Sequence, residues 1–286
     1  MSLAHRFDAL LARAATEGTR TGRNLVAFSG GVDSSLVALL VHESFGTRAT
    51  ACLGVSASLP AEQEDLAMRI AAHIGIRLER VATREGEDAE YVANRGLSCY
   101  VCKSVLYDTM HAIARDAEQA GGVFVLYNGT NADDFADETR VGLRAAHERG
   151  VVSLLRDVTK HDVRALARHV GLPNWEHAAA PCLRSRLASG VAATSDHLAR
   201  VAEAERRVRA RSAAAVHENL RVRHLAGDAA AIEADATLLA RLDVDACTAD
   251  LHALGFTSVA LRVFASGSVA ASPPAGMPGP AAQKKE

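Results

Sequence analysis

The first 170 residues alternate short apolar runs with longer amphipathic segments. The apolar runs predict strands at residues 24–28, 50–56, 77–83 and 123–127. The amphipathic segments repeat apolar side chains every three or four positions, which predicts helices at residues 1–20, 34–44, 61–74, 104–120 and 162–170. Strands that alternate with helices favour a parallel sheet covered on both faces, and such sheets bind ligands beyond the carboxyl ends of their strands.

A different pattern begins after residue 180. Residues 181–190 predict a loop at a domain junction, and a charged helix is expected at 195–211. The next apolar runs predict three short strands and one helix, at residues 219–225, 230–234, 258–263 and 238–254. We therefore expect a domain at 1–180, a smaller α+β domain at 181–267, and a disordered tail at 268–286, which is rich in Pro, Gly, Ala and Lys.

The first strand runs into the string SGGVDSS at residues 29–35. Two glycines let the backbone approach an anion, and the amide groups at the start of the following helix favour negative charge. The pattern GxxxxGK[ST] is absent, which disfavours phosphoryl transfer of the kinase type. A bare Gly-Gly turn would be the alternative, but the full string favours phosphate binding. The candidate ligands are Ser29, Gly30, Gly31, Asp33, Ser34 and Ser35.

This string resembles the signature of the N-type ATP pyrophosphatases, the PP-loop superfamily of GMP, NAD and asparagine synthetases and tRNA-thiolating enzymes. The resemblance implies that ATP is cleaved between its α and β phosphates and that AMP is joined to a substrate. It also implies an α/β fold, with a parallel-sheet adenine-nucleotide alpha-hydrolase-like (PP-loop) domain. ATP and Mg²⁺ are the expected cofactors. Ser56 and Gly129 are further ATP-binding candidates, and Asp33 and Asp134 are candidate metal ligands.

The five cysteines are an odd number at irregular spacing, which disfavours a disulfide framework. Cys182 lies near Arg184 and Arg186, and positive charge favours the nucleophilic thiolate, although free cysteines often only fill a core. Cys99 and Cys102 have the spacing of half a zinc site, of a redox dithiol, or of a plain local turn. Packing is the expected role of the remaining two, Cys52 and Cys247.

Several segments together are similar to the LarE family of ATP-dependent sacrificial sulfur transferases. They are PCLRSRLASG, CYVCKSVLY, NGTNADD, GLPNW, LRVRH and LGF, and in family-like order they extend from about residue 23 to residue 267. The family usually has a DYRPG-like stretch where this chain has residues 137–142, which leaves the substrate fit at that loop open. The resemblance implies a pyridinium dicarboxylate mononucleotide as substrate, on the way to the nickel-pincer nucleotide cofactor of lactate racemase.

The resemblance also implies roles for particular side chains. Cys182 would attack the adenylated carboxylate and give up its own sulfur, or a persulfide route resolved by Cys99 and Cys102 would spare the protein. Arg221 and Arg223 alternate along one strand face and suit a phosphate clamp, unless they form a solvated edge strand. The remaining substrate-binding candidates are Arg184, Arg186 and Glu205; solvated loop arginines and a helix-surface charge are their plainer interpretations.

Charge and hydropathy limit the kinds of partner that we expect for this chain. The net charge of −2 gives no global basic excess, so a nucleic-acid partner is not expected. Neither a secretory signal nor a run of about 18 apolar residues is found, so we expect no membrane span and a cytoplasmic location. The family tends to form homo-oligomers. Three rival functions stay open: a tRNA thiolase, an amide-forming synthetase of the GMP or NAD synthetase type, and a nucleotide sensor.

Overall fold

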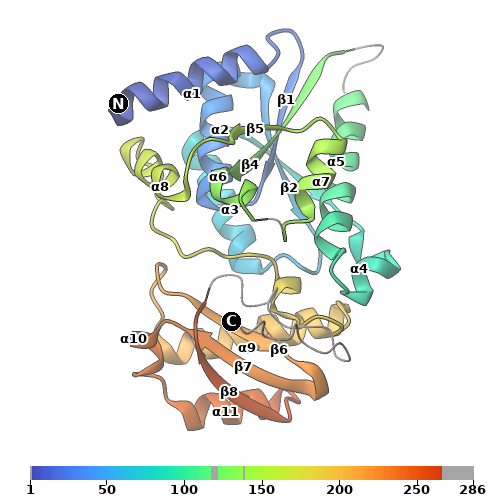
Figure 1. Cartoon of the computed structure of the whole chain (residues 1–286), viewed down its shortest axis with the longest axis vertical. Coiled ribbons are helices and arrows are strands. Elements are labelled where there is room, and N and C mark those ends of the chain that lie inside the picture. Colours follow the sequence, from blue (N-terminus) through green and yellow to red (C-terminus); the bar gives the residue numbers. More distant parts are fainter. Residues whose placement is uncertain (1, 117–121, 138, 266–286) are drawn as a thin grey trace, which may run out of the picture.

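The computed structural model describes residues 2–116, 122–137 and 139–265. The chain folds into two lobes, the first built on a five-stranded sheet and the second on a three-stranded sheet (Figure 1). The tail expected at residues 268–286 lies outside the described residues. No helix of the described ranges is long and apolar enough to cross a membrane.

The sheet of the first lobe is entirely parallel and has the order β3-β2-β1-β4-β5. Its strands are β1 (Arg23–Phe28), β2 (Ala49–Val55), β3 (Arg77–Ala82), β4 (Phe124–Asn131) and β5 (Val152–Leu155). The central strand β1 is buried at every position after Arg23, as expected for a strand covered on both faces. The predicted parallel α/β fold is confirmed.

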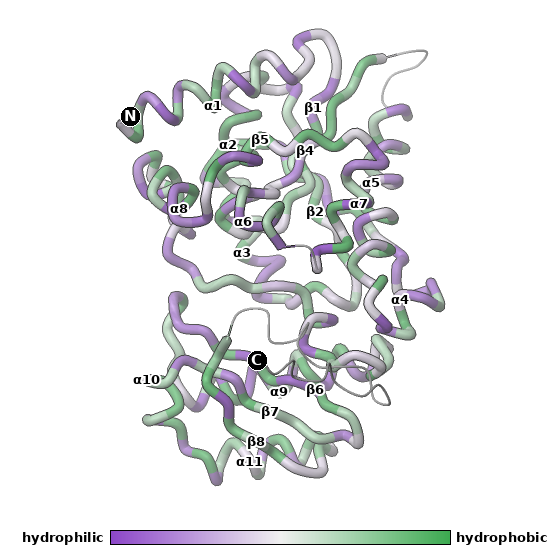
Figure 2. The backbone as a smooth tube through the Cα atoms, viewed as in Figure 1, coloured by the Kyte–Doolittle hydropathy of each residue, from purple (hydrophilic) through white to green (hydrophobic). Residues whose placement is uncertain are grey.

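Helices cover both faces of this sheet, and each face has its own core. Residues of α1 (Leu3–Glu17), α2 (Val32–Phe45), α3 (Ala61–Ile74) and α8 (Lys160–His169) pack in one core, with Leu36, Leu40 and Ile70 fully buried. On the other face, α5 (Ser98–Asp116) and α7 (Gly142–Glu148) bury Tyr107 and Met110 against the sheet. Apolar colour is concentrated in the strands and on the inward sides of the helices (Figure 2).

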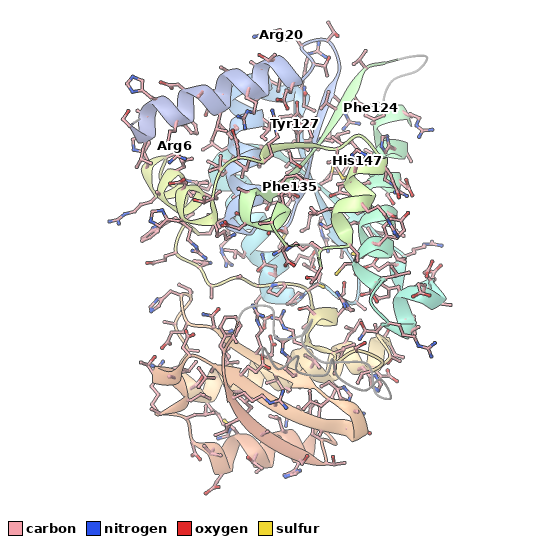
Figure 3. All side chains as sticks on the ribbon, viewed as in Figure 1. Arg6, Arg20, Phe124, Tyr127, Phe135 and His147 are labelled. Atoms are coloured by element: carbon pink, nitrogen blue, oxygen red, sulfur yellow. The ribbon has the colours of Figure 1, made fainter. Side chains whose placement is uncertain are left out.

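Several expected boundaries were wrong. Helix α5 begins at Ser98, not 104, so the Cys99 pair lies in the first turns of a helix; the Ser98 hydroxyl there donates to the carbonyl of Tyr91 at 3.0 Å. Strand β4 continues to Asn131. Tyr127, whose side chain is labelled in Figure 3, lies within this strand and donates to Asn24 of the neighbouring strand β1 at 3.0 Å. Strand β5 and helices α4 (Ala89–Ala93), α6 (Ala132–Phe135) and α7 were not predicted.

The second lobe combines a mixed sheet with helices, as the expected α+β domain requires. Strands β6 (Leu220–His224), β7 (Ala229–Ala234) and β8 (Ser258–Val263) have the order β6-β7-β8; β6 is antiparallel to β7, and β8 is parallel to it. Helix α9 (Ser195–Ser212) contributes Ala204 and Val208 to the core. The single helix expected at 238–254 is two, α10 (Ala236–Leu239) and α11 (Val244–Ala253), because Asp243 caps the amide of Ala246 and starts a new helix.

Residues 183–193 join the two lobes. A small apolar cluster combines Tyr91 of α4 with Leu183, Leu187 and Leu198. The amide of Leu183 donates to the carbonyl of Ser58 at 2.8 Å, on the rim of the first sheet. The segment after Cys182 is therefore bound to the first lobe, and the expected domain boundary at residue 180 stays a prediction.

Candidate functional site

The phosphate-loop candidates lie between β1 and α2. Gly31 is the N-cap residue of α2, so Val32, Asp33 and the residues after them present the first amide groups of a helix. The hydroxyls of Ser34 and Ser35 donate to the carbonyl of Gly31 at 3.0 and 2.9 Å. The amide of Ser29 donates to Ser34 Oγ at 3.2 Å, which closes a tight turn at a helix N-terminus, the geometry that favours an anion.

Close packing fixes the shape of this loop. Gly30 has a φ of 69°, and a Cβ there would lie 2.7 Å from Ala67. A Cβ on Gly129 would lie 2.7 Å from the backbone nitrogen of Ser34, so β4 reaches the start of α2 only because this residue is glycine. The buried amide of Asn174 donates to the Gly30 carbonyl at 2.8 Å and to Ser35 Oγ at 3.0 Å.

The two candidate metal ligands meet beside the loop. Asn131 connects them, because its side chain donates to Asp33 at 3.1 Å and accepts from the amide of Asp134 at 3.1 Å. Burial raises the pKa of Asp134, and the charge of Asp33 is a further cause. Lys160 forms an ion pair with Asp33, and Arg140 pairs with Asp134 at 2.8 Å. Carboxylate oxygens are the ligands that Mg²⁺ prefers, and in this structure each of the two carboxylates is paired with a cation, so the metal role of Asp33 and Asp134 stays a prediction.

The hydroxyl of Ser56, an expected ATP ligand, is hydrogen-bonded to an acidic side chain. Its hydroxyl donates to Glu85 at 2.6 Å, and Ser58 donates to the same carboxylate oxygen at 3.3 Å. Glu85 is 2% exposed, and its second oxygen is buried with no hydrogen-bond partner among the described residues. Since the Ser58 carbonyl holds the amide of Leu183, Glu85 supports the turn on which the Cys182 segment is docked.

Three of the five cysteines gather at this junction. Cys99 is exposed at the start of α5, Cys102 is partly covered one turn later, and Cys182 precedes the short 3₁₀ helix η3 (Leu183–Arg186). Burial raises the pKa of the Cys102 thiol to about 12, and Cys182 is the second cause. Arg184 donates to Cys99 Sγ. Burial opposes the charge of Arg184, but Cys99 and Cys182 outweigh it and raise its pKa.

The expected substrate arginine Arg186 is buried and is paired with a carboxylate. It is 4% exposed, and its Nε donates to Glu205 of α9 at 2.7 Å. Glu205 also accepts the amide of Val222 in β6 at 3.1 Å. The interpretations of Arg186 as a solvated loop arginine and of Glu205 as a surface charge are therefore wrong. The pair ties the Cys182 segment to the second lobe.

Arg221 and Arg223 lie on one face of β6, as expected, but every residue of the strand is buried, so a solvated edge is excluded. Arg223 pairs with Glu233 of β7 at 2.8 Å. Burial lowers the pKa of Arg221 to about 10, and the charges of Arg186 and Arg223 add to this. Arg186 and Arg223 are each paired with a carboxylate, whereas Arg221 donates to the carbonyl of Ala179 at 3.3 Å; a guanidinium at that place suits an anionic substrate group.

A separate polar cluster lies at the end of β6. His197, His224 and Asp228 have ligand atoms within 4.8 Å of one another, a spacing that a metal ion would require. Arg200 donates to Asp228 at 2.7 Å, at the same carboxylate oxygen that contacts His224. A guanidinium therefore already supplies the positive charge at this position, and the cluster is explained as an ion-paired link between α9 and β6.

Sequence reasoning missed three side chains that contact the expected site. Lys160 follows strand β5 and Glu85 follows strand β3, so their position at the carboxyl ends of the strands could have identified both as site residues. Asn174 belongs to the GLPNW segment, which marked the end of a helix but gave no sign that its amide would bind the phosphate loop.

The comparisons with known proteins agree with this geometry. No protein-family model matches the chain. An uncharacterized protein of Synechocystis sp. is 42% identical over 185 residues, 64% of this chain and 67% of that protein. The GMP synthase of Zymomonas mobilis is 30% identical over 172 residues, 54% of this chain but only 32% of the synthase, which supports membership of the PP-loop superfamily. The pyridinium-3,5-bisthiocarboxylic acid mononucleotide synthase of Lactiplantibacillus plantarum is 34% identical over 190 residues, 65% of this chain and 67% of the enzyme. With a phosphate loop and a cysteine cluster on one rim and this identity over two thirds of the enzyme, the chain belongs to the family of pyridinium-3,5-bisthiocarboxylic acid mononucleotide synthase, the LarE family.

Proposed function

We propose that this protein is an ATP-dependent sulfur transferase. Its substrate is pyridinium-3,5-biscarboxylic acid mononucleotide, and it converts a carboxylate of that molecule to a thiocarboxylate for the nickel-pincer nucleotide cofactor of lactate racemase. Membership of the LarE family supports this assignment. The observation that carries it is the docking of the Cys182 segment, through Leu183 and Ser58, onto the rim that holds the phosphate loop.

The first half of the reaction overcomes the poor leaving group of a carboxylate. A substrate carboxylate oxygen attacks the α-phosphorus of ATP, pyrophosphate leaves, and an acyl adenylate forms. The first amide groups of α2, those of Val32 and Asp33, bind the departing phosphates, with Lys160 as an additional cation. Asp33 and Asp134 would hold Mg²⁺, which neutralises phosphate charge when it is bound.

The second half delivers sulfur. The thiolate of Cys182 attacks the acyl carbon, AMP leaves, and a thioester joins substrate to protein. Loss of the α proton of this residue and cleavage of its Cβ–S bond release the thiocarboxylate and leave dehydroalanine. Arg221, which lies beside Arg186 and Arg223, binds the substrate phosphate, while these two arginines stay paired with Glu205 and Glu233. Each polypeptide then acts once, because its sulfur is spent.

The neighbouring thiols offer a second source of sulfur. A persulfide on Cys99 or Cys102 would attack the same adenylate with its terminal sulfur, and AMP would leave. The thiolate of the other cysteine would then attack the inner sulfur, break the S–S bond, release the thiocarboxylate and leave a disulfide between Cys99 and Cys102. Both cysteines lie in the first turns of α5. This route needs an external donor of sulfane sulfur, whereas the route through Cys182 needs none, so the two routes differ in their requirement for a donor.

Product analysis tests the assignment. The purified chain is incubated with ATP, Mg²⁺ and the biscarboxylic acid mononucleotide, and the nucleotide products are separated. We expect AMP and pyrophosphate in the amount of the acid consumed, together with one thiocarboxylate for each Cys182. The variant Cys182→Ser keeps adenylation and loses the thiocarboxylate. Formation of ADP and phosphate, or of an amide when ammonia is added, contradicts the proposal.

A further inference from the structure

Asn94 has an unusual backbone conformation and is almost fully buried. It is 2% exposed, and its φ of 52° and ψ of 46° lie in the left-handed region. Only Ala213 and Asp228 share a positive φ with it among the non-glycine residues that the structure describes. Asparagine tolerates this conformation better than most residues, and here it ends helix α4 as its C-cap, which turns the side chain toward the segment after Cys182.

The side-chain amide of Asn94 holds the segment that follows Cys182. Its Nδ2 donates to the carbonyls of Ala188 and Val191, both at 3.0 Å. Its backbone carbonyl accepts the amide of Gly190 at 3.0 Å. One residue at the end of α4 thus receives the turn that follows η3 and ties it to the first lobe.

The side-chain oxygen of Asn94 orients the charged group of Arg184. Asn94 Oδ1 accepts from Arg184 Nη1 at 3.1 Å, while the other terminal nitrogen of Arg184 donates to Cys99 Sγ. A guanidinium is a rigid planar fork, so an acceptor on one arm fixes where the other arm points. Lys103 and Cys102 also interact electrostatically with this thiol, and Cys182 and Tyr91 interact with Arg184.

We propose that Asn94 is a positioning residue, which aims Arg184 at Cys99 and fixes the backbone that carries Cys182. Its effect on thiol reactivity stands by itself, and its effect on sulfur delivery rests on the proposed function. Removal of the amide frees Arg184 to turn toward water. The thiol of Cys99 then loses its hydrogen-bonded cation, and the Cys182 segment loses three contacts with α4.

Alkylation of the full chain tests the first part without ATP or substrate. Iodoacetamide is added at pH 7, and the rate at each cysteine is followed by peptide mass spectrometry. Asn94→Gly keeps the left-handed backbone without strain. We expect it to slow alkylation of Cys99 about tenfold, the effect of losing a hydrogen bond to a charged group. Ala213→Gly, the matched change at another left-handed residue, leaves the rate unchanged.

A double-mutant cycle separates positioning from general destabilisation. If Asn94 acts through Arg184, the double variant with Arg184→Gln reacts at Cys99 as slowly as Arg184→Gln alone. Additive effects, or a wild-type rate in Asn94→Gly, overturn the proposal. Asn94→Asp also tolerates a positive φ and keeps an oxygen for Arg184, so it should fold and react faster than Arg184→Gln. Equal rates in those two variants overturn it as well.

Product assays then address sulfur delivery. Asn94→Gly should release pyrophosphate at the wild-type rate and form the thiocarboxylate at least tenfold more slowly, since the hydrogen bond to the charged Arg184 is lost. Equal loss of both activities contradicts a role limited to the Cys182 segment. If the wild-type chain forms no thiocarboxylate at all, the proposed function fails, while the alkylation rates still decide the role of Asn94.

Discussion

Glu205 is predicted to be essential for holding the second lobe to the Cys182 segment. Its carboxylate accepts Arg186 Nε at 2.7 Å, Arg186 Nη2 at 3.2 Å and the amide of Val222 at 3.1 Å. The side chains of Arg186 and Glu205 are 4% and 13% exposed. Glu205→Ala would leave the buried guanidinium of Arg186 without its carboxylate, which costs roughly 3–5 kcal/mol of unfolding free energy. The amide of Val222 would lose its acceptor as well, which costs about 1–3 kcal/mol, and part of this cost is already included in the first figure.

Equilibrium urea denaturation, followed by circular dichroism, measures this loss. Glu205→Gln keeps an oxygen for Val222 and removes only the charge, so it should lose less than Glu205→Ala. Glu203→Ala is the matched control on the same helix, because Glu203 pairs with Arg206 and Arg207 at the surface. If Glu205→Ala is as stable as Glu203→Ala, the buried ion pair does not hold the lobes in the way described.

Three further changes test the rim. Lys160→Ala leaves Asp33 without its cation, so the KM for ATP should rise by about tenfold; an unchanged KM contradicts the phosphate role. Glu85→Gln removes a negative charge that raises the pKa of Cys102, so alkylation of Cys102 at pH 8 should accelerate, and slower alkylation would contradict this. Burial raises the pKa of Asp134, so as the pH is lowered the rate of pyrophosphate release should fall at a higher pH than an ordinary aspartate would cause. A higher Mg²⁺ concentration should move this fall to lower pH, because the metal competes with the proton. If the pH of the fall does not depend on Mg²⁺, Asp134 is not a metal ligand.

The sequence predicted those helices and strands whose apolar pattern is clear within a single continuous segment. Helix α3 was placed at its observed bounds, and the three strands of the second lobe were placed to within one residue. Strand β5 was missed because only four residues form it, too few for a clear pattern. The start of α5 was missed because its first turn is polar and is fixed by tertiary contacts, such as the hydrogen bond from Ser98 to Tyr91.

Candidate residues in the phosphate loop could be identified because one continuous string contains them all. The burial of the arginines could not be predicted, because it depends on partners that are far away in the chain. Arg186 is covered by Glu205 of α9, and Arg223 is covered by Glu233 of the neighbouring strand. A guanidinium in a predicted loop looks solvated until its carboxylate is known. The same limit concealed Asn94, whose side-chain hydrogen-bond partners lie about 90 residues further along the chain.

The most direct test of the central claim is the intact mass of the protein after one turnover. The chain is mixed with ATP, Mg²⁺ and the biscarboxylic acid mononucleotide, without any sulfur donor, and its mass is measured before and after. The proposed mechanism predicts the loss of one H₂S, localised by peptide mapping to residue 182 as dehydroalanine, together with one thiocarboxylate per lost sulfur. Thiocarboxylate formed while Cys182 stays intact would contradict it.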